Sequence, residues 1–93
     1  MPYRISYSDT AIRTLKRLPG YLRAWARREI EALTEDPRPP SAKELRDEPD
    51  TYRIWMKGWR LIYFIDDEDE AVWVMDIRPK TGPETYEDLD EIG

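Results

Sequence analysis

Apolar positions near the amino end alternate at first and then recur at helical spacing. Tyr3, Ile5 and Tyr7 alternate with polar residues, which predicts a short strand. Ser8 follows as a good helix N-cap. The helix that it introduces is predicted from four apolar residues at helical spacing, and Pro19-Gly20 ends it; these four are Ala11, Ile12, Leu15 and Leu18.

A second helical pattern runs from about residue 21 to residue 35. Its apolar positions gather on one side, and they are Leu22, Trp25, Ala26, Ile30 and Leu33. Its opposite side is basic and carries Arg23, Arg27 and Arg28. Because the Pro-Gly connection is short, the two helices are predicted to form an antiparallel hairpin.

A proline-rich stretch separates the helices from a sheet-like second half. The sequence EDPRPPSAKELRDEPD has four prolines in sixteen residues and predicts a long irregular connection. Runs rich in aromatic and β-branched residues over 52–56, 59–65 and 71–77 predict a three-stranded antiparallel meander. Residues 84–92 predict a short carboxy-terminal helix. The predicted fold class is α+β, with the first strand and the meander in one sheet that packs on the helices, in a single domain of residues 1–93.

The first hairpin of the meander carries cations among residues typical of a core. A two-residue turn at Lys57-Gly58 leaves one face fully apolar, and that face is expected to pack on the helices. The other face carries Arg53 and Arg60 as diagonal neighbours, roughly 7–8 Å apart at their backbones. Two like charges at this spacing call for carboxylate partners or for an anionic ligand such as phosphate. The pattern alone leaves both possibilities open.

Composition limits the chemistry that this chain can perform. It contains no cysteine and no histidine, which excludes disulfides, thiolate metal sites and the commonest general base. We expect no metal and no other cofactor, because the acidic run DDEDE lacks the ligand spacing and the glycine of a calcium loop. No apolar run approaches the roughly 18 residues that span a bilayer, so we expect a cytoplasmic protein without membrane contacts.

Charge is distributed unevenly along the chain. The net charge is -5, yet residues 1–30 hold seven basic and two acidic side chains, whereas residues 51–93 hold five and eleven. A net negative charge argues against indiscriminate nucleic-acid binding. The basic amino-terminal third could still contact RNA, or it could be a solvated helix surface.

Three stretches follow one another in order and cover nearly the whole chain: YRISYSDTAIRTLKRLP, DPRPPSAKELRDEPDTYRI and GWRLIYFIDDEDEAVWVMDI. Together they resemble the RelE/ParE superfamily of type II toxin-antitoxin toxins. Toxins of the RelE branch cleave mRNA in the ribosomal A site by attack of a ribose 2′-hydroxyl on the adjacent phosphate, without a metal. The resemblance implies catalytic roles for Arg53, Arg60, Lys80 and Tyr86.

The chain also departs from the pattern of that branch. Trp55 stands where the branch has a second basic residue in the strand, a proposed proton-transfer lysine. Lys57, two residues further on and on the same face, could substitute for it. Trp55 either stacks on a base or packs within the sheet, and Tyr86 either takes part in catalysis or anchors the tail. With Trp55 and Lys57, we name Arg23 and Arg27 as candidates for RNA binding.

The leading hypothesis is a ribosome-dependent mRNA endoribonuclease that inhibits translation, and a cognate antitoxin is expected to neutralise it. Its partners would then be the antitoxin, the ribosome and mRNA. Two alternatives stay open on the same resemblance. One is a ParE-like protein that inhibits DNA gyrase without catalysis, and the other is an inactive family member that acts only through protein interactions.

Overall fold

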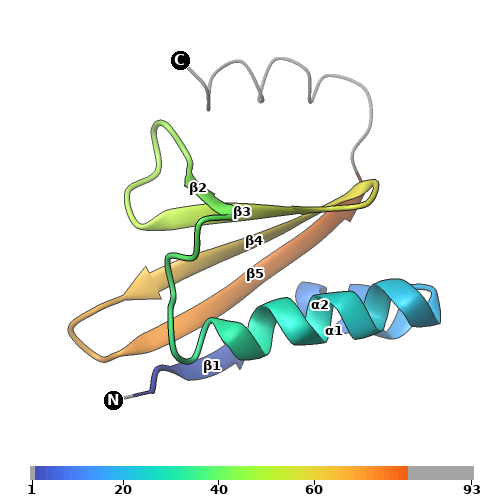
Figure 1. The fold of residues 1–93 in the computed structure, drawn as a ribbon, viewed down its shortest axis with the longest axis horizontal. Coiled ribbons are helices and arrows are strands. Elements are labelled where there is room, and N and C mark those ends of the chain that lie inside the picture. Colours follow the sequence, from blue (N-terminus) through green and yellow to red (C-terminus); the bar gives the residue numbers. More distant parts are fainter. Residues whose placement is uncertain (1, 80–93) are drawn as a thin grey trace.

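The computed structural model describes residues 2–79, which form two helices and five strands (Figure 1). Their order is β1 (Arg4–Tyr7), α1 (Asp9–Arg17), α2 (Gly20–Ala32), β2 (Ala42–Glu44), β3 (Thr51–Met56), β4 (Trp59–Asp66) and β5 (Ala71–Pro79). This order confirms the predicted α+β class. The predicted carboxy-terminal helix lies outside the described residues, and so do Lys80 and Tyr86.

All five strands belong to one mixed sheet, in the order β1-β5-β4-β3-β2. The strand β1 pairs in parallel with β5, and the meander β3-β4-β5 is antiparallel as predicted. The sequence interpretation was wrong on one element, because the proline-rich connection was expected to be irregular throughout. Its residues Ala42–Glu44 form β2, which pairs with β3 at the edge of the sheet. Three residues between prolines are too few to show a strand periodicity.

The predicted register of the first hairpin is confirmed at every pair. Arg53 lies opposite Ile62, and Trp55 lies opposite Arg60. The turn at Lys57-Gly58 needs glycine, because Gly58 has a φ of +73°, in the left-handed region that other residues rarely adopt. The hairpin register therefore follows from the turn and from the apolar face that it aligns.

Both helices lie on one side of the sheet (Figure 1). Ser8 caps α1 as predicted, since its hydroxyl oxygen accepts a hydrogen bond from the backbone N–H of Ala11 at 3.0 Å. Pro19 fixes the short link to α2. Among residues 2–79, no helix combines the length and the apolar character that crossing a membrane requires.

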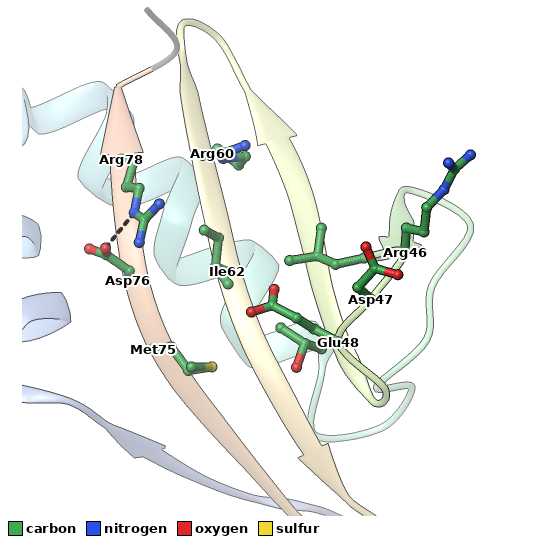
Figure 2. A pocket seen from close by; sticks show the side chains of 10 residues that line it. Arg46, Asp47, Glu48, Arg60, Ile62, Met75, Asp76 and Arg78 are labelled. Atoms are coloured by element: carbon green, nitrogen blue, oxygen red, sulfur yellow. Dashed lines mark hydrogen bonds and ion pairs between the residues drawn. The ribbon is translucent and has the colours of Figure 1, made fainter. Parts of the chain in front are cut away.

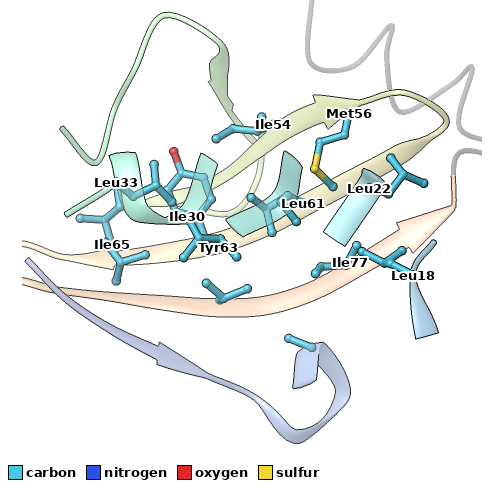
Figure 3. Close-up of a cluster of buried hydrophobic side chains, with 14 residues drawn as sticks. Leu18, Leu22, Ile30, Leu33, Ile54, Met56, Leu61, Tyr63, Ile65 and Ile77 are labelled. Carbon is cyan, nitrogen blue, oxygen red and sulfur yellow. The ribbon is translucent and has the colours of Figure 1, made fainter. Parts of the chain in front are cut away.

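The core lies between the helices and the apolar face of the sheet (Figure 3). The helices and their C-caps contribute Ala11, Leu18, Leu22, Ala26, Ile30 and Leu33, and the strands contribute Ile54, Met56, Leu61, Tyr63, Ile65, Val72, Val74 and Ile77. The Tyr63 hydroxyl donates a hydrogen bond to the carbonyl oxygen of Pro37 at 2.8 Å, which ties the long connection to β4. Burial raises the pKa of Tyr63, so its phenol stays a neutral donor.

An ion pair also fastens the long connection to the rest of the fold. The guanidinium of Arg38 donates to both carboxylate oxygens of Asp67, at 3.1 and 2.8 Å, and to the Tyr52 hydroxyl at 2.9 Å. The hydroxyl of Tyr3 donates to the same carboxylate at 2.7 Å. The acidic loop between β4 and β5 thus includes one carboxylate that joins the connection to Tyr3, the residue just before β1.

Candidate functional site

The sheet face that points away from the helices holds two rows of polar and aromatic side chains. In one row, Arg53 of β3 lies opposite Ile62 of β4, which lies opposite Asp76 of β5. The next row places Trp55, Arg60 and Arg78 on the same three strands. Because side chains on neighbouring strands share a face when they are opposed, these residues gather above the middle of the sheet.

The two arginines predicted as a pair are both buried on this face. Arg53 exposes 6% of its surface and Arg60 exposes 4%. The ring of Trp55 contacts both, since the guanidinium carbon of Arg53 lies 4.5 Å from the ring centre and that of Arg60 lies 5.8 Å from it. Both distances fall within the range of cation–π contacts. From the sequence, Trp55 was expected either to stack on a base or to pack within the sheet. Its contacts with Arg53 and Arg60 were not predicted.

Arg78 is a third cation on this face, and the sequence interpretation missed it. It lies opposite Arg60 in the sheet, and its Nε donates to the Asp76 carboxylate at 2.7 Å. A β-bulge near Ile62 and Tyr63 shifts the register, so that Met75 and Asp76 both reach this side. The sequence carries a signal of this shift, because Val72 and Val74 alternate but Asp76 stands where the alternation requires an apolar residue, and Ile77 is buried instead.

From these rows, Arg60, Ile62, Asp76 and Arg78 form one wall of a pocket of about 690 Å³, called the arginine pocket below, and the loop between β2 and β3 forms the other wall (Figure 2). Its cations are Arg46, Arg60 and Arg78, and its carboxylates are Asp47, Glu48 and Asp76. The Glu48 side chain points toward β4, whereas Arg46 points away from the strands (Figure 2). The pocket can therefore hold an anion against guanidinium groups, in competition with carboxylates of the protein itself.

Other predicted site residues lie elsewhere. Lys57 is exposed on the turn between β3 and β4. Arg23 and Arg27 lie on α2 and line a separate hollow of about 340 Å³ with Tyr7, Leu15 and Lys16. The sheet separates the helices from the arginine pocket, so the predicted RNA-binding residues do not form one continuous cluster.

Arg23 has a clear structural task. Its guanidinium donates to the carbonyl oxygens of Leu15, Lys16 and Leu18, at 3.1, 3.2 and 2.9 Å. These carbonyls lie at the carboxyl end of α1, where a helix leaves its last acceptors without intrahelical donors and carries partial negative charge. Arg23 therefore caps α1 and holds the helical hairpin together.

A family model described as the ParE toxin of the type II toxin-antitoxin system parDE matches residues 5–81. The chain therefore belongs to this toxin family.

Proteins similar to this chain include RelE toxins. The chain is 28% identical to the mRNA interferase toxin RelE of Escherichia coli over 88 residues, which cover 92% of each protein. The crystal structure of isolated E. coli RelE matches with a TM-score of 0.77 and 26% identity, over 94% of each chain. A chain of the toxin-antitoxin complex RelBE2 of Mycobacterium tuberculosis matches with a TM-score of 0.73 and 29% identity, over 86% of this chain and 100% of that one.

Proposed function

We propose that this toxin cleaves mRNA on the ribosome and that the arginine pocket binds the scissile phosphate. The observation that carries the proposal is the pair Arg53 and Arg60, nearly buried on the open face and joined there by Arg78. Lys80 and Tyr86 keep the roles that the resemblance implies, phosphate binding for the lysine and positioning or protonation for the tyrosine. The similarity to proteins named mRNA interferases supports the choice of substrate.

The chemistry suits these residue types. The 2′-oxygen of a ribose attacks the adjacent phosphorus, a new P–O bond forms, and the bond to the 5′-oxygen of the next nucleotide breaks. Negative charge accumulates on the non-bridging oxygens in the transition state, and guanidinium groups fixed in advance stabilise it. Arginine is well suited because its planar fork donates to two phosphate oxygens at once.

Burial strengthens this effect. Charges interact more strongly where water is excluded, and Arg60 exposes only 4% of its surface. The carboxylates of Glu48 and Asp76 line the same pocket and oppose the entry of an anion. Glu48 lies on a loop and Asp76 on β5, so an RNA backbone must approach in an orientation that keeps its phosphates near the arginines and away from these two carboxylates. The pocket thus favours an ordered substrate, such as mRNA held on a ribosome, over RNA in free solution.

The experiment is a translation extract supplied with the purified toxin, followed by mapping of mRNA 5′ ends. We expect new ends within the translated part of the message, and none when ribosomes are omitted. Arg60→Ala should strongly reduce their yield, while Arg28→Ala, which removes an exposed arginine of α2, serves as the matched control. Intact mRNA at toxin concentrations that stop translation would contradict the proposal.

A second candidate is inhibition of DNA gyrase, and the matching ParE family model is the observation that favours it. A gyrase inhibitor needs a binding surface and no phosphate chemistry. It would block supercoiling by purified gyrase and leave mRNA intact, and Arg60→Ala would have little effect on it. An inactive family member would do neither, and strong expression without any partner would leave growth unchanged.

We further propose that a cognate antitoxin neutralises the chain and contacts the basic helical hairpin as well as the arginine face. Solved structures of similar toxins include complexes with RelB antitoxins, among them that of E. coli, which matches with a TM-score of 0.77 and 26% identity. Reversing the charge at Arg27 and Arg28 tests the hairpin contact, because Arg23 caps α1 and must be kept. We expect weaker co-purification with the protein of the neighbouring reading frame. Unchanged co-purification would remove the hairpin from the interface.

A further inference from the structure

The ring of Trp55 contacts two buried arginines on the open face of the sheet. Its ring lies 4.5 Å from the guanidinium carbon of Arg53 and 5.8 Å from that of Arg60, although the two arginines belong to different strands. Arg53 is two residues before Trp55 on β3, and Arg60 lies opposite Trp55 on β4. One indole therefore contacts both of the buried arginines assigned to the phosphate.

Physical chemistry explains why an aromatic ring suits this position. Two guanidinium groups on neighbouring strands repel each other, and burial strengthens the repulsion because water screens it less. The negative face of an indole attracts a cation, and tryptophan provides the strongest such attraction among the aromatic side chains. The ring is rigid, so a contact with it restricts the orientation of each guanidinium group. It does so without supplying an anionic group that would compete with phosphate.

We propose that Trp55 is a positioning residue that holds Arg53 and Arg60 in the orientation needed to stabilise the phosphate during cleavage. The inference rests on the proposed function. It gives position 55 a different task from that of a proton-transferring lysine, since an indole neither accepts the proton of a 2′-hydroxyl nor adds a positive charge. Trp55 acts on the reaction through the two arginines, and not through the substrate.

Three substitutions separate this role from the others that Trp55 could have. Trp55→Phe keeps an aromatic face, Trp55→Leu keeps apolar volume without a π-system, and Trp55→Lys introduces the basic residue typical of the RelE branch. The measurement is single-turnover mRNA cleavage on programmed ribosomes over a range of toxin concentrations. It yields a rate constant at saturation and a half-saturating concentration for each variant.

The phenylalanine variant should retain the rate constant to within about three-fold, because one cation–π partner replaces another. The leucine and lysine variants should both lose about 10-fold to 100-fold in the rate constant, with little change in half-saturation, because misplaced arginines stabilise the transition state poorly. A faster lysine variant would overturn the inference, since it would show that position 55 lacks only a base. A leucine variant that changes half-saturation alone would also overturn it, because that result indicates stacking on an RNA base.

A readout that needs no activity completes the test. Ring currents of Trp55 should shift the NMR signals of the Nε–H groups of Arg53 and Arg60, and Trp55→Leu should abolish these shifts. Arg38 serves as the internal control, because it lies 5.5 Å from the ring centre of Tyr52 and its signal should not move. Unchanged signals of Arg53 and Arg60 in an active toxin would overturn the inference alone. Shifted signals in a chain that cleaves no mRNA would overturn the proposed function, and with it the catalytic part of the inference.

Discussion

The chain uses arginine in two contrasting ways. Arg38 lies at the surface and binds carboxylates, with both nitrogens of its fork on Asp67 and a longer contact of 3.6 Å to Asp50. Arg53 and Arg60 lie buried on the open face of the sheet, where both contact the ring of Trp55. A carboxylate binds a guanidinium through charge and hydrogen bonds, whereas an aromatic ring contacts its flat face and restricts its orientation.

Under the proposed function, Arg38 serves stability, whereas Arg53 and Arg60 serve phosphate binding. Arg38 joins the long connection to the acidic loop and to Tyr52, so its contacts are all directed toward fixing the chain path. The pair on the open face stands instead where charge is expensive to bury and where a pocket opens. Proteins usually accept such a position when a ligand benefits from it.

The largest effect is expected for Arg60→Ala. Removing a fixed cation from the transition state should lower the rate of mRNA cleavage by about 10²-fold to 10³-fold, the range observed when one preorganised donor is lost. Ribosome-dependent cleavage with end mapping measures it. Because Arg60 is buried, Arg60→Met is the companion variant, which keeps the length and packing of the side chain without its charge.

Two outcomes would contradict this assignment. Cleavage by Arg60→Met at the rate of the unaltered toxin, with a thermal midpoint that is also unchanged, would remove Arg60 from the chemistry. Equal losses of activity in Arg60→Met and Arg38→Ala would show that both arginines act only through the stability of the fold. The comparison therefore requires a melting curve for each variant.

The converse variant, Arg38→Ala, should affect stability more than cleavage. It removes a two-pronged contact with Asp67 and the hydrogen bond to Tyr52, but its side chain is 38% exposed and water screens the charges. We expect a loss of about 1 kcal/mol in the free energy of unfolding, measured by urea denaturation. Arg28→Ala, an exposed α2 arginine, should change it by less than about 0.5 kcal/mol. A similar loss in both variants would deny Arg38 its special role.

The sequence sufficed for the parts of the fold that obey local rules. The Ser8 cap, the two helices and the register of the hairpin were predicted because capping, helical spacing and turn geometry act over a few residues. The strand β2 was not predicted, because a three-residue edge strand forms through its pairing with β3 and is too short to show a hydrophobic alternation of its own. Tertiary pairing decides such elements.

The site was predictable only in part, for the same reason. Turn geometry sufficed to place Arg53 and Arg60 on one face, but no local rule aims Trp55 at both of them. Arg78 joined the site through a β-bulge, whose sequence signal is only a break in the alternation of buried residues. The partner of Arg38 could not be predicted either, because Asp67 is distant in sequence and no sequence feature distinguishes it from its acidic neighbours.

A smaller effect is expected where the two uses of arginine meet, at Arg78. This cation lines the pocket, yet its Nε is held by the Asp76 carboxylate at 2.7 Å. Asp76→Asn removes one negative charge from the pocket and releases Arg78 toward an anion. We expect a few-fold tighter binding of a short RNA, about 1 kcal/mol or less for an exposed pair, measured by fluorescence anisotropy at low salt. Weaker binding would mean that Asp76 aligns Arg78 for the ligand.

The smallest effect is expected in the pH dependence of the stability that the contact between Arg38 and Asp67 contributes. Hydrogen bonds from Arg38, and then from Tyr3, hold the pKa of Asp67 below its ordinary value in the folded chain. A carboxylate with a lowered pKa stabilises the fold above its unfolded pKa, about 3.9, and loses this contribution as the pH falls through the folded value. The unaltered chain should therefore melt higher than Asp67→Asn at pH 6, and the gap should close below about pH 4. Glu68→Gln, which neutralises an exposed neighbour in the same loop, is the matched control, and a gap of the same size and pH dependence there would assign the effect to the general charge of the loop.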